Sequence, residues 1–250
     1  SGYPALVNAV DTISGPAGTT ELLVGVLPDQ ATAPSAFSVF SYLGGSGDEG
    51  TEANDTAIAQ IVATNAYFYV GGTTDSTILP GATGGAQNTN GGGTSDIFIS
   101  RIPLNGHAGR GFRSTFAGGT GEDRIGGLAF DSRADKVLFF GTTTGSFPTQ
   151  NTTPASSWFD SSFGGGRDIV VGTYASDLKT KEFASYIGGS ANDYMGSTGS
   201  LIGQGHLAYS DVTGLTYVGT TIHSDQLTLD AGVMSGVPGK DKTTSTSNSN

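Results

Sequence analysis

The apolar residues of this chain fall in short runs of β-branched and aromatic side chains, separated by clusters of Gly, Asp, Ser and Pro. Runs of this length, bounded by turn-forming residues, are typical of β-strands. No segment outside the loops repeats apolar residues at the i, i+3, i+4, i+7 spacing over three turns, so the pattern does not favour helices. In the middle of the chain it predicts four strands, at residues 126–131, 136–141, 168–174 and 182–187.

Three motifs recur in the same order, with a period of about 70 residues, which indicates a repeat architecture. The first motif is an aromatic residue, an apolar or small residue, and Gly-Gly. The second is aromatic-apolar-Gly followed by threonines, and the third is a glycine run, then Asp, then a strand-like stretch. The copies lie at residues 42–45, 116–119 and 186–189 for the first motif, 69–74, 139–143 and 217–221 for the second, and 96–99 and 168–171 for the third.

Each repeat has the length and pattern of a four-stranded antiparallel sheet. Such a sheet cannot bury its apolar face alone, but copies stacked face to face can, as in propellers and other arrays. The sequence therefore predicts an all-β fold, a β-propeller-like array of about 3.5–4 four-stranded antiparallel blades. The expected units are a partial, degenerate blade at 1–40, repeats at 41–115 and 116–185, a truncated repeat at 186–241, and a Ser/Thr-rich tail or linker at 242–250.

The partial first unit departs from the pattern. In it, residues 22–25 are expected to replace the second motif, and residues 37–40 the third.

The ordered motifs resemble the SBBP (β-propeller) repeats of extracellular proteins. The matching segments are residues 42–48, 116–123 and 186–193, the threonine pairs of the second motif, Phe147-Pro148-Thr149, and Gly165-Gly166-Arg167-Asp168. The resemblance covers roughly residues 41–241 and implies a propeller fold, a structural or surface role, and a secreted or cell-surface location.

The number of repeats does not decide between three forms of assembly. A seven-bladed ring with this period would need roughly 490 residues. The chain therefore holds about half of such a ring, closes as a small four-bladed ring, or stacks as an open array. An incomplete ring leaves unpaired strand edges, which predicts partners among copies of the chain or other protein subunits.

Composition narrows the function further. The net charge is −11, which argues against nucleic acid as a partner, because phosphate binding needs clustered Lys and Arg. The absence of cysteine excludes disulfides, thiolate metal sites and a cysteine nucleophile. No apolar run approaches the 18 residues of a membrane span.

The polar feature repeated most often is an acidic turn after each Gly-Gly. Two interpretations stay open: the acids are Ca²⁺ ligands, the one cofactor the sequence suggests, or they are turn formers that bond their own backbone. Two aspartates, Asp96 and Asp168, follow glycine runs and are expected to satisfy backbone groups of the turn. The candidate metal ligands are Asp48, Glu49, Glu122, Asp123 and Asp193.

An insertion at 151–163 carries Trp158 and Phe159. These aromatic side chains either contact a glycan or protein partner, or pack as a lid over their own blade.

The sequence nominates no catalytic residue, because nucleophile-elbow and Walker motifs are missing. The favoured function is a non-catalytic, extracytoplasmic structural module that self-associates or assembles with other subunits. A glycan- or Ca²⁺-binding, lectin-like propeller is the alternative, and a carbohydrate-active enzyme is less favoured.

Overall fold

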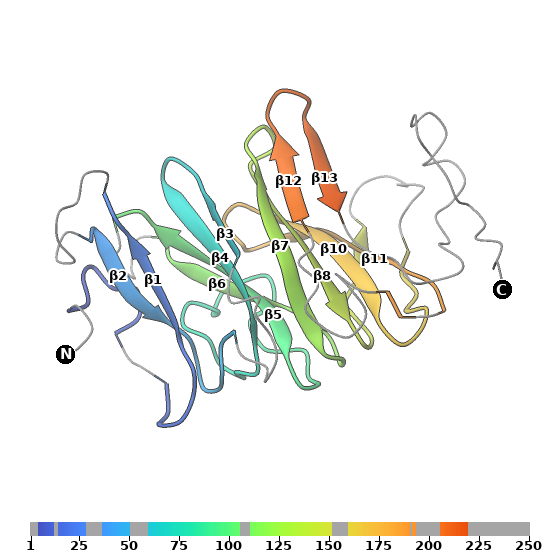
Figure 1. Cartoon of the computed structure of the whole chain (residues 1–250), viewed down its shortest axis with the longest axis horizontal. Helices are drawn as coiled ribbons and strands as arrows, with labels where there is room; N and C mark the ends of the chain where they lie inside the picture. Colours follow the sequence, from blue (N-terminus) through green and yellow to red (C-terminus); the bar gives the residue numbers. More distant parts are fainter. Residues whose placement is uncertain are drawn as a thin grey trace, which may run out of the picture.

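The protein is all-β. The computed structural model describes residues 5–12, 15–28, 37–50, 60–105, 111–151, 160–190, 192–193 and 206–219. Within these ranges it has thirteen strands and no helix, and the strands form four antiparallel sheets, none of them closed (Figure 1).

The four sheets follow one another in chain order. The first contains β1 (Leu22–Val26) and β2 (Val39–Leu43), and the fourth contains β12 (His206–Ser210) and β13 (Leu215–Gly219). The second sheet consists of β3 (Gln60–Ala63), β4 (Tyr67–Thr74), β5 (Asp96–Pro103) and β6 (Arg113–Ala117). The third consists of β7 (Asp123–Asp131), β8 (Lys136–Thr143), β10 (Asp168–Ala175) and β11 (Lys181–Ile187), with the short β9 (Gln150–Asn151) at its edge.

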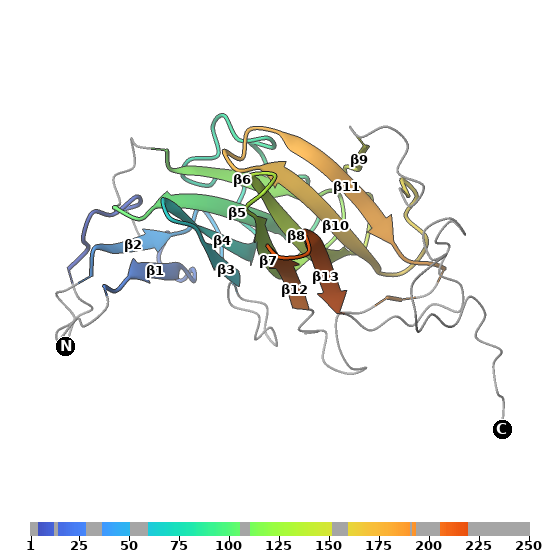
Figure 2. The same ribbon diagram turned by 90° about the horizontal axis from the view of Figure 1, so that it is seen from above.

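Neighbouring sheets pack face to face, and an apolar cluster lies between each pair (Figure 2). Because side chains alternate along a strand, the central strands bury both of their faces. On β5, Phe98 points toward the first sheet, while Ile97 and Ile99 point toward the third. The third and fourth sheets meet through a smaller cluster that includes Phe140 and Leu207.

The strands of the middle repeat confirm the sequence prediction. The four expected strands all lie within observed strands. They are residues 126–131 in β7, 136–141 in β8, 168–174 in β10 and 182–187 in β11. The sheets begin and end at other residues than the expected units, because the Gly-Gly motif follows the last strand of the first, second and third sheets. The second sheet thus ends at Ala117, just before Gly118-Gly119.

The prediction for the partial first unit was wrong. Residues 22–25 belong to β1, which pairs with β2 as β5 pairs with β6: Leu22 lies opposite Leu43, as Ile97 lies opposite Ala117. Residues 22–25 are therefore a copy of the third motif, with Glu21 in the place of Asp96. Residues 37–40 lead into the strand that carries the first motif.

Among the described strands, the two end sheets match different parts of a complete sheet. β1 and β2 correspond to the last two strands of a complete sheet. β12 and β13 form an antiparallel hairpin that corresponds to the first two strands, β3–β4 or β7–β8. The second and third sheets lie between the end sheets, which places the end sheets at opposite ends of the stack (Figure 1).

Candidate functional site

Each Gly-Gly motif begins a turn that is closed by a buried carboxylate four residues later. The backbone amide of the second glycine donates a hydrogen bond to this carboxylate, and all three acids are fully buried. The repeated acid is thus an integral part of its turn. The donor–acceptor pairs are Gly45 N to Glu49 Oε2 (3.1 Å), Gly119 N to Asp123 Oδ2 (2.6 Å) and Gly189 N to Asp193 Oδ2 (3.0 Å).

A second carboxylate comes from the residue at the start of the neighbouring strand. Asp96 Oδ2 accepts a hydrogen bond from Gly91 N at 3.0 Å, and Asp168 Oδ2 accepts one from Gly164 N at 2.6 Å. These bonds confirm the backbone-satisfying role expected for both aspartates. In the first sheet, Glu21 takes the same position and accepts a hydrogen bond from Gly15 N at 2.6 Å.

The two carboxylates of each turn meet where the first glycine lacks a side chain. A Cβ on Gly118 would overlap Asp96 Oδ1 and come within 2.8 Å of Asp123 Oδ2. A Cβ on Gly188 would lie 2.5 Å from Asp168 Oδ1 and 2.9 Å from Asp193 Oδ2, and one on Gly44 would overlap Glu21 and Glu49. The first glycine makes room for a carboxyl pair, and the second donates its amide to one member. The carboxyl pairs are Glu21–Glu49, Asp96–Asp123 and Asp168–Asp193.

Burial makes these carboxyl groups hold protons more tightly than usual. Burial, and then the neighbouring charge of Asp123, raises the pKa of Asp96 to about 7. Burial likewise raises the pKa of Asp123 to about 6, although hydrogen bonds from Thr143 and Gly119 oppose the shift. Among the described residues, Asp96 Oδ1 and Asp123 Oδ1 accept no hydrogen bond. A proton on one carboxyl group would let that group donate to the other, which is the usual state of two close, buried acids.

In the other two pairs, the pKa values of Glu49, Asp168 and Glu21 are shifted in the same direction. Burial raises the pKa of Glu49 to about 7 and that of Asp168 to about 6, in the second case with help from the charge of Asp193. Burial also raises the pKa of Glu21. Near neutral pH, Asp96 and Glu49 therefore still hold part of their protons, each in a carboxyl pair that links a Gly-Gly turn to the strand beside it.

The acids proposed as metal ligands separate into two groups. Glu49, Asp123 and Asp193 belong to carboxyl pairs, whereas Asp48 and Glu122 lie outside them. Asp48 Oδ1 accepts a hydrogen bond from Thr20 N at 2.6 Å. Within the described ranges, no three His, Asp or Glu side chains converge on a position that could hold a metal ion.

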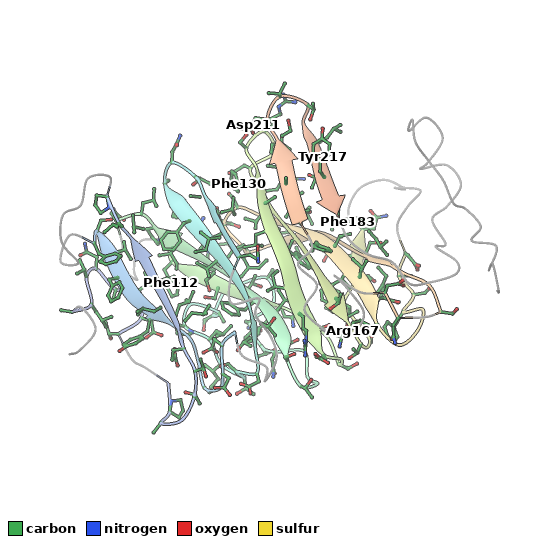
Figure 3. All side chains as sticks on the ribbon, in the orientation of Figure 1. Phe112, Phe130, Arg167, Phe183, Asp211 and Tyr217 are labelled. Atoms are coloured by element: carbon green, nitrogen blue, oxygen red, sulfur yellow. The ribbon has the colours of Figure 1, made fainter. Side chains whose placement is uncertain are left out.

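Glu122 instead forms ion pairs with two buried arginines. Its carboxylate pairs with Arg124 and, at 2.9 Å, with Arg167 Nη2. Arg167 (labelled in Figure 3) also donates from Nη1 to Thr142 Oγ1 at 3.2 Å. The network joins the start of β10 to the turn before β7. Sequence reasoning missed it because Arg167 and Glu122 lie in different parts of the repeat.

Both end sheets carry exposed apolar side chains. Leu23 on β1 is 41% exposed, and Leu215 and Tyr217 on β13 are 57% and 52% exposed. β12 packs against β7 at one side of the third sheet. Beside it, a cavity of about 500 Å³ remains open between the third and fourth sheets. Figure 3 marks Phe183 and Tyr217 on the two sides of this region. Its apolar lining includes Val171, Phe183, Ile187, Leu207 and Val218.

Trp158 and Phe159, the proposed glycan or partner contacts, lie outside the described residues. Of the described residues of the insertion, Asn151 belongs to β9, which pairs with the outer edge of β11.

No helix in the described part of the chain is long and apolar enough to cross a bilayer.

Comparison with known proteins does not assign this chain to a family. No protein-family model and no curated protein sequence matches this chain.

Proposed function

We propose that this chain is a non-catalytic structural module, a propeller-like array of blades that assembles with other protein subunits through its two end sheets. The observation that carries the proposal is the pair of two-stranded end sheets, each with exposed apolar side chains. Unpaired strand edges and uncovered apolar faces favour association, because pairing satisfies backbone groups and removes apolar surface from water.

The use of the acidic residues supports a structural role over catalysis. The same carboxyl pair occurs at three equivalent turns, and its members accept backbone hydrogen bonds. Asp96, Asp123, Asp168 and Asp193 are at most 1% exposed, so they offer no surface to a substrate.

The proposed location is the cell surface or the extracellular space. It rests on the resemblance of the repeats to SBBP repeats, which occur in extracellular proteins.

Light scattering of the purified chain over a wide concentration series tests the proposed function. The expected result is a mass above the 25.2 kDa of one chain that rises with concentration. A mass of one chain at every concentration would contradict the proposal.

Calcium binding at the carboxyl pairs is a second candidate, favoured by buried oxygens that accept no hydrogen bond. These are Oδ1 of Asp96, Asp123 and Asp168. Calcium at 100 times its Kd would stabilise the fold by about 2.7 kcal/mol, visible as a higher Tm. The shift should vanish in Asp123→Asn and persist in Asp177→Asn, a surface control. An unchanged Tm with calcium at pH 8 would remove this candidate.

A further inference from the structure

We propose that a groove at the tips of the β3–β4, β7–β8 and β12–β13 hairpins binds a neutral saccharide, which stacks on aromatic side chains while its hydroxyl groups donate to the carboxylates of Asp135 and Asp211. The site goes beyond the proposed function, because it makes no use of the assembly of subunits.

The groove lies where the first strands of three successive sheets come together. β7 contacts both β3 and β12, and Figure 2 shows these three strands on one side of the stack. The volume of the groove is about 610 Å³, which is within the range of small-molecule sites in proteins. Its lining comes from the three hairpins and from the β10–β11 turn, which contributes Ser176.

Aromatic side chains from three sheets line the groove. Tyr67 and Tyr69 lie on the same face of β4, because side chains two residues apart share a face. Tyr69 is buried and stacks on Phe130 of β7, with ring centroids 5.6 Å apart and 20° between the ring planes. Tyr67, Phe130 and Tyr209 of β12 are partly exposed. A sugar ring has apolar C–H faces, so these aromatic side chains offer it contact area without requiring a charge.

Two exposed carboxylates supply hydrogen-bond acceptors to the groove. Asp135 Oδ2 accepts a hydrogen bond from Ser176 Oγ at 2.6 Å, and Asp211 Oδ1 accepts one from Ser132 Oγ. The second oxygen of each carboxylate has no donor among the described residues. Because a carboxylate accepts several hydrogen bonds, these oxygens can take hydroxyl groups of a sugar. Figure 3 labels Asp211 and Phe130, from the β12–β13 turn and from β7.

The backbone at Asp135 is a separate reason to assign a role to its carboxylate. Asp135 has a φ of 55°, and Gly214, at the same place before the second strand of the β12–β13 hairpin, has a φ of 70°. Glycine adopts this conformation without strain, whereas a residue with a side chain is less stable in it. A side chain at a position that favours glycine indicates that the side chain is used. The bond from Ser176 accounts for only one of its two oxygens.

Hydrogen bonds between neighbouring turns fix the shape of the groove. Tyr69 OH donates to Ser176 O at 2.9 Å, and Arg101 Nη1 donates to the same carbonyl oxygen at 3.3 Å. Arg133 Nη2 donates to Val212 O at 3.0 Å, which joins the β7–β8 turn to the β12–β13 turn. Groups that are already fixed lose little freedom when a ligand binds, so this arrangement favours affinity.

The lining favours a neutral sugar over charged ligands. The carboxylates oppose an anion, and the guanidinium of Arg101, 4.4 Å from the centre of the Tyr67 ring, already provides that ring with a cation. Other cavities of the described residues do not combine these groups. Those beside Gly44-Gly45 and Gly118-Gly119 have no aromatic lining, and the cavity between the third and fourth sheets is mainly apolar.

Affinity electrophoresis of the wild-type chain tests the site, because a chain with a net charge of −11 migrates readily in a native gel. Separate gels contain hydroxyethyl cellulose, soluble starch or galactomannan, which are neutral, and one gel contains no polysaccharide. We expect at least one polysaccharide to retard the chain relative to a reference protein that does not bind sugars. The dependence of the retardation on polysaccharide concentration gives the Kd.

Matched variants locate the binding. Asp135→Asn keeps the size of the side chain but removes its charge, and Phe130→Leu keeps an apolar side chain but removes the ring. Each should raise the Kd about tenfold, the effect of losing one hydrogen bond to a charged group or one aromatic contact. Asp177→Asn removes the same charge from a side chain that is 42% exposed and lies outside the groove, so its Kd should equal that of the wild type. Thermal melting shows that each variant is folded at the temperature of the gel.

The outcomes separate this inference from the proposed function. A Kd raised in Asp135→Asn and in Phe130→Leu, and unchanged in Asp177→Asn, supports the site. No retardation of the wild-type chain by any of the three polysaccharides overturns it, and so does retardation that is the same in all variants. Light scattering, which tests assembly, should give the same mass for the wild type and for Asp135→Asn.

Discussion

The middle and end sheets have related sequences but differ in how much of each strand is covered. Phe98 on β5 is fully buried, while its counterpart Leu23 on β1 is 41% exposed. Both side chains lie on the same face of their sheets, and in the part of the chain that the structure describes only β5 has a preceding sheet packed on that face. Burial in this fold is therefore decided by the neighbouring sheet as much as by the residue, and the end sheets carry core-type residues without a complete core.

The largest expected effect of this difference is on the free energy of unfolding when a core side chain is truncated. Phe98→Ala should lower the free energy of unfolding by about 3–5 kcal/mol, because it leaves a cavity between the first and second sheets. Leu23→Ala, at the equivalent place in the end sheet, should cost less than about 1 kcal/mol when measured at a concentration where copies are separate. Urea denaturation of both variants measures the contrast. Similar losses would show that the first sheet is packed as tightly as the second.

The Gly-Gly turns allow a second contrast. Gly118→Ala should destabilise the fold by about 1–3 kcal/mol, because its Cβ would displace the Asp96 carboxylate. At Gly219 the same methyl group would meet no atom of the described residues within 4 Å, so the effect of Gly219→Ala should stay within about 0.5 kcal/mol. Thermal melting of the two variants in one buffer provides the measurement. An equally tolerated Gly118→Ala would contradict the close approach of the carboxyl pair.

The carboxyl pairs predict that stability falls as pH rises. The folded protein keeps protons on Asp96 and Glu49 up to about pH 7, whereas these acids normally titrate at 3.8 and 4.5. This contribution to the free energy of unfolding is complete below about pH 4 and is lost as pH rises through 7. In Asp96→Asn the pH dependence should be shallower, by up to about 1.4 kcal/mol per pH unit for the proton concerned.

Asp177→Asn is the matched control for this pH experiment, since it removes the same charge from an exposed side chain. Its slope of stability against pH should equal that of the wild type. A slope in Asp96→Asn that is as steep as the wild-type slope would mean that Asp96 holds no proton in the folded state.

The smallest effect on the stability of a single chain is expected from Leu23→Lys. A charged residue at this exposed position should change the free energy of unfolding by less than about 0.5 kcal/mol. It should nevertheless reduce the mass seen by light scattering, because burying an unpaired lysine opposes association through the first sheet. Ile78→Lys, outside the end sheets, should leave that mass unchanged. Equal effects of the two variants would argue against Leu23 as an interface residue.

The sequence was sufficient for the strands of the middle repeat, because alternation and Gly-rich boundaries are local signals. It was misleading for residues 22–25, since a glycine ends the apolar run in the second motif and also in the 168–171 copy of the third. Leu22-Leu23-Val24-Gly25 in fact matches Ile169-Val170-Val171-Gly172 of β10, and the acid before each run was the signal that separates the two motifs.

The sequence indicated single acids of the carboxyl pairs but not that these acids pair. Glu49 and Asp123 stood out as acids that follow Gly-Gly, and Asp96 as an acid that follows a glycine run. Nothing local indicates that Asp96 and Asp123 meet, because they come from different strands and approach through tertiary packing. The role of Glu122 was likewise hidden, since its partner Arg167 is supplied by the next segment of the sheet.

Because Gly118 has no side chain, the residues allowed at Gly118, Asp96 and Asp123 depend on one another. The space it leaves is filled by two acids, so a mutation at any one of the three changes what the other two can be. Copies of this unit in other chains should therefore keep or lose the set jointly: first glycine, acid four residues after the second glycine, and acid at the start of the adjoining strand. A copy with a larger residue at the first glycine should also lack an acid.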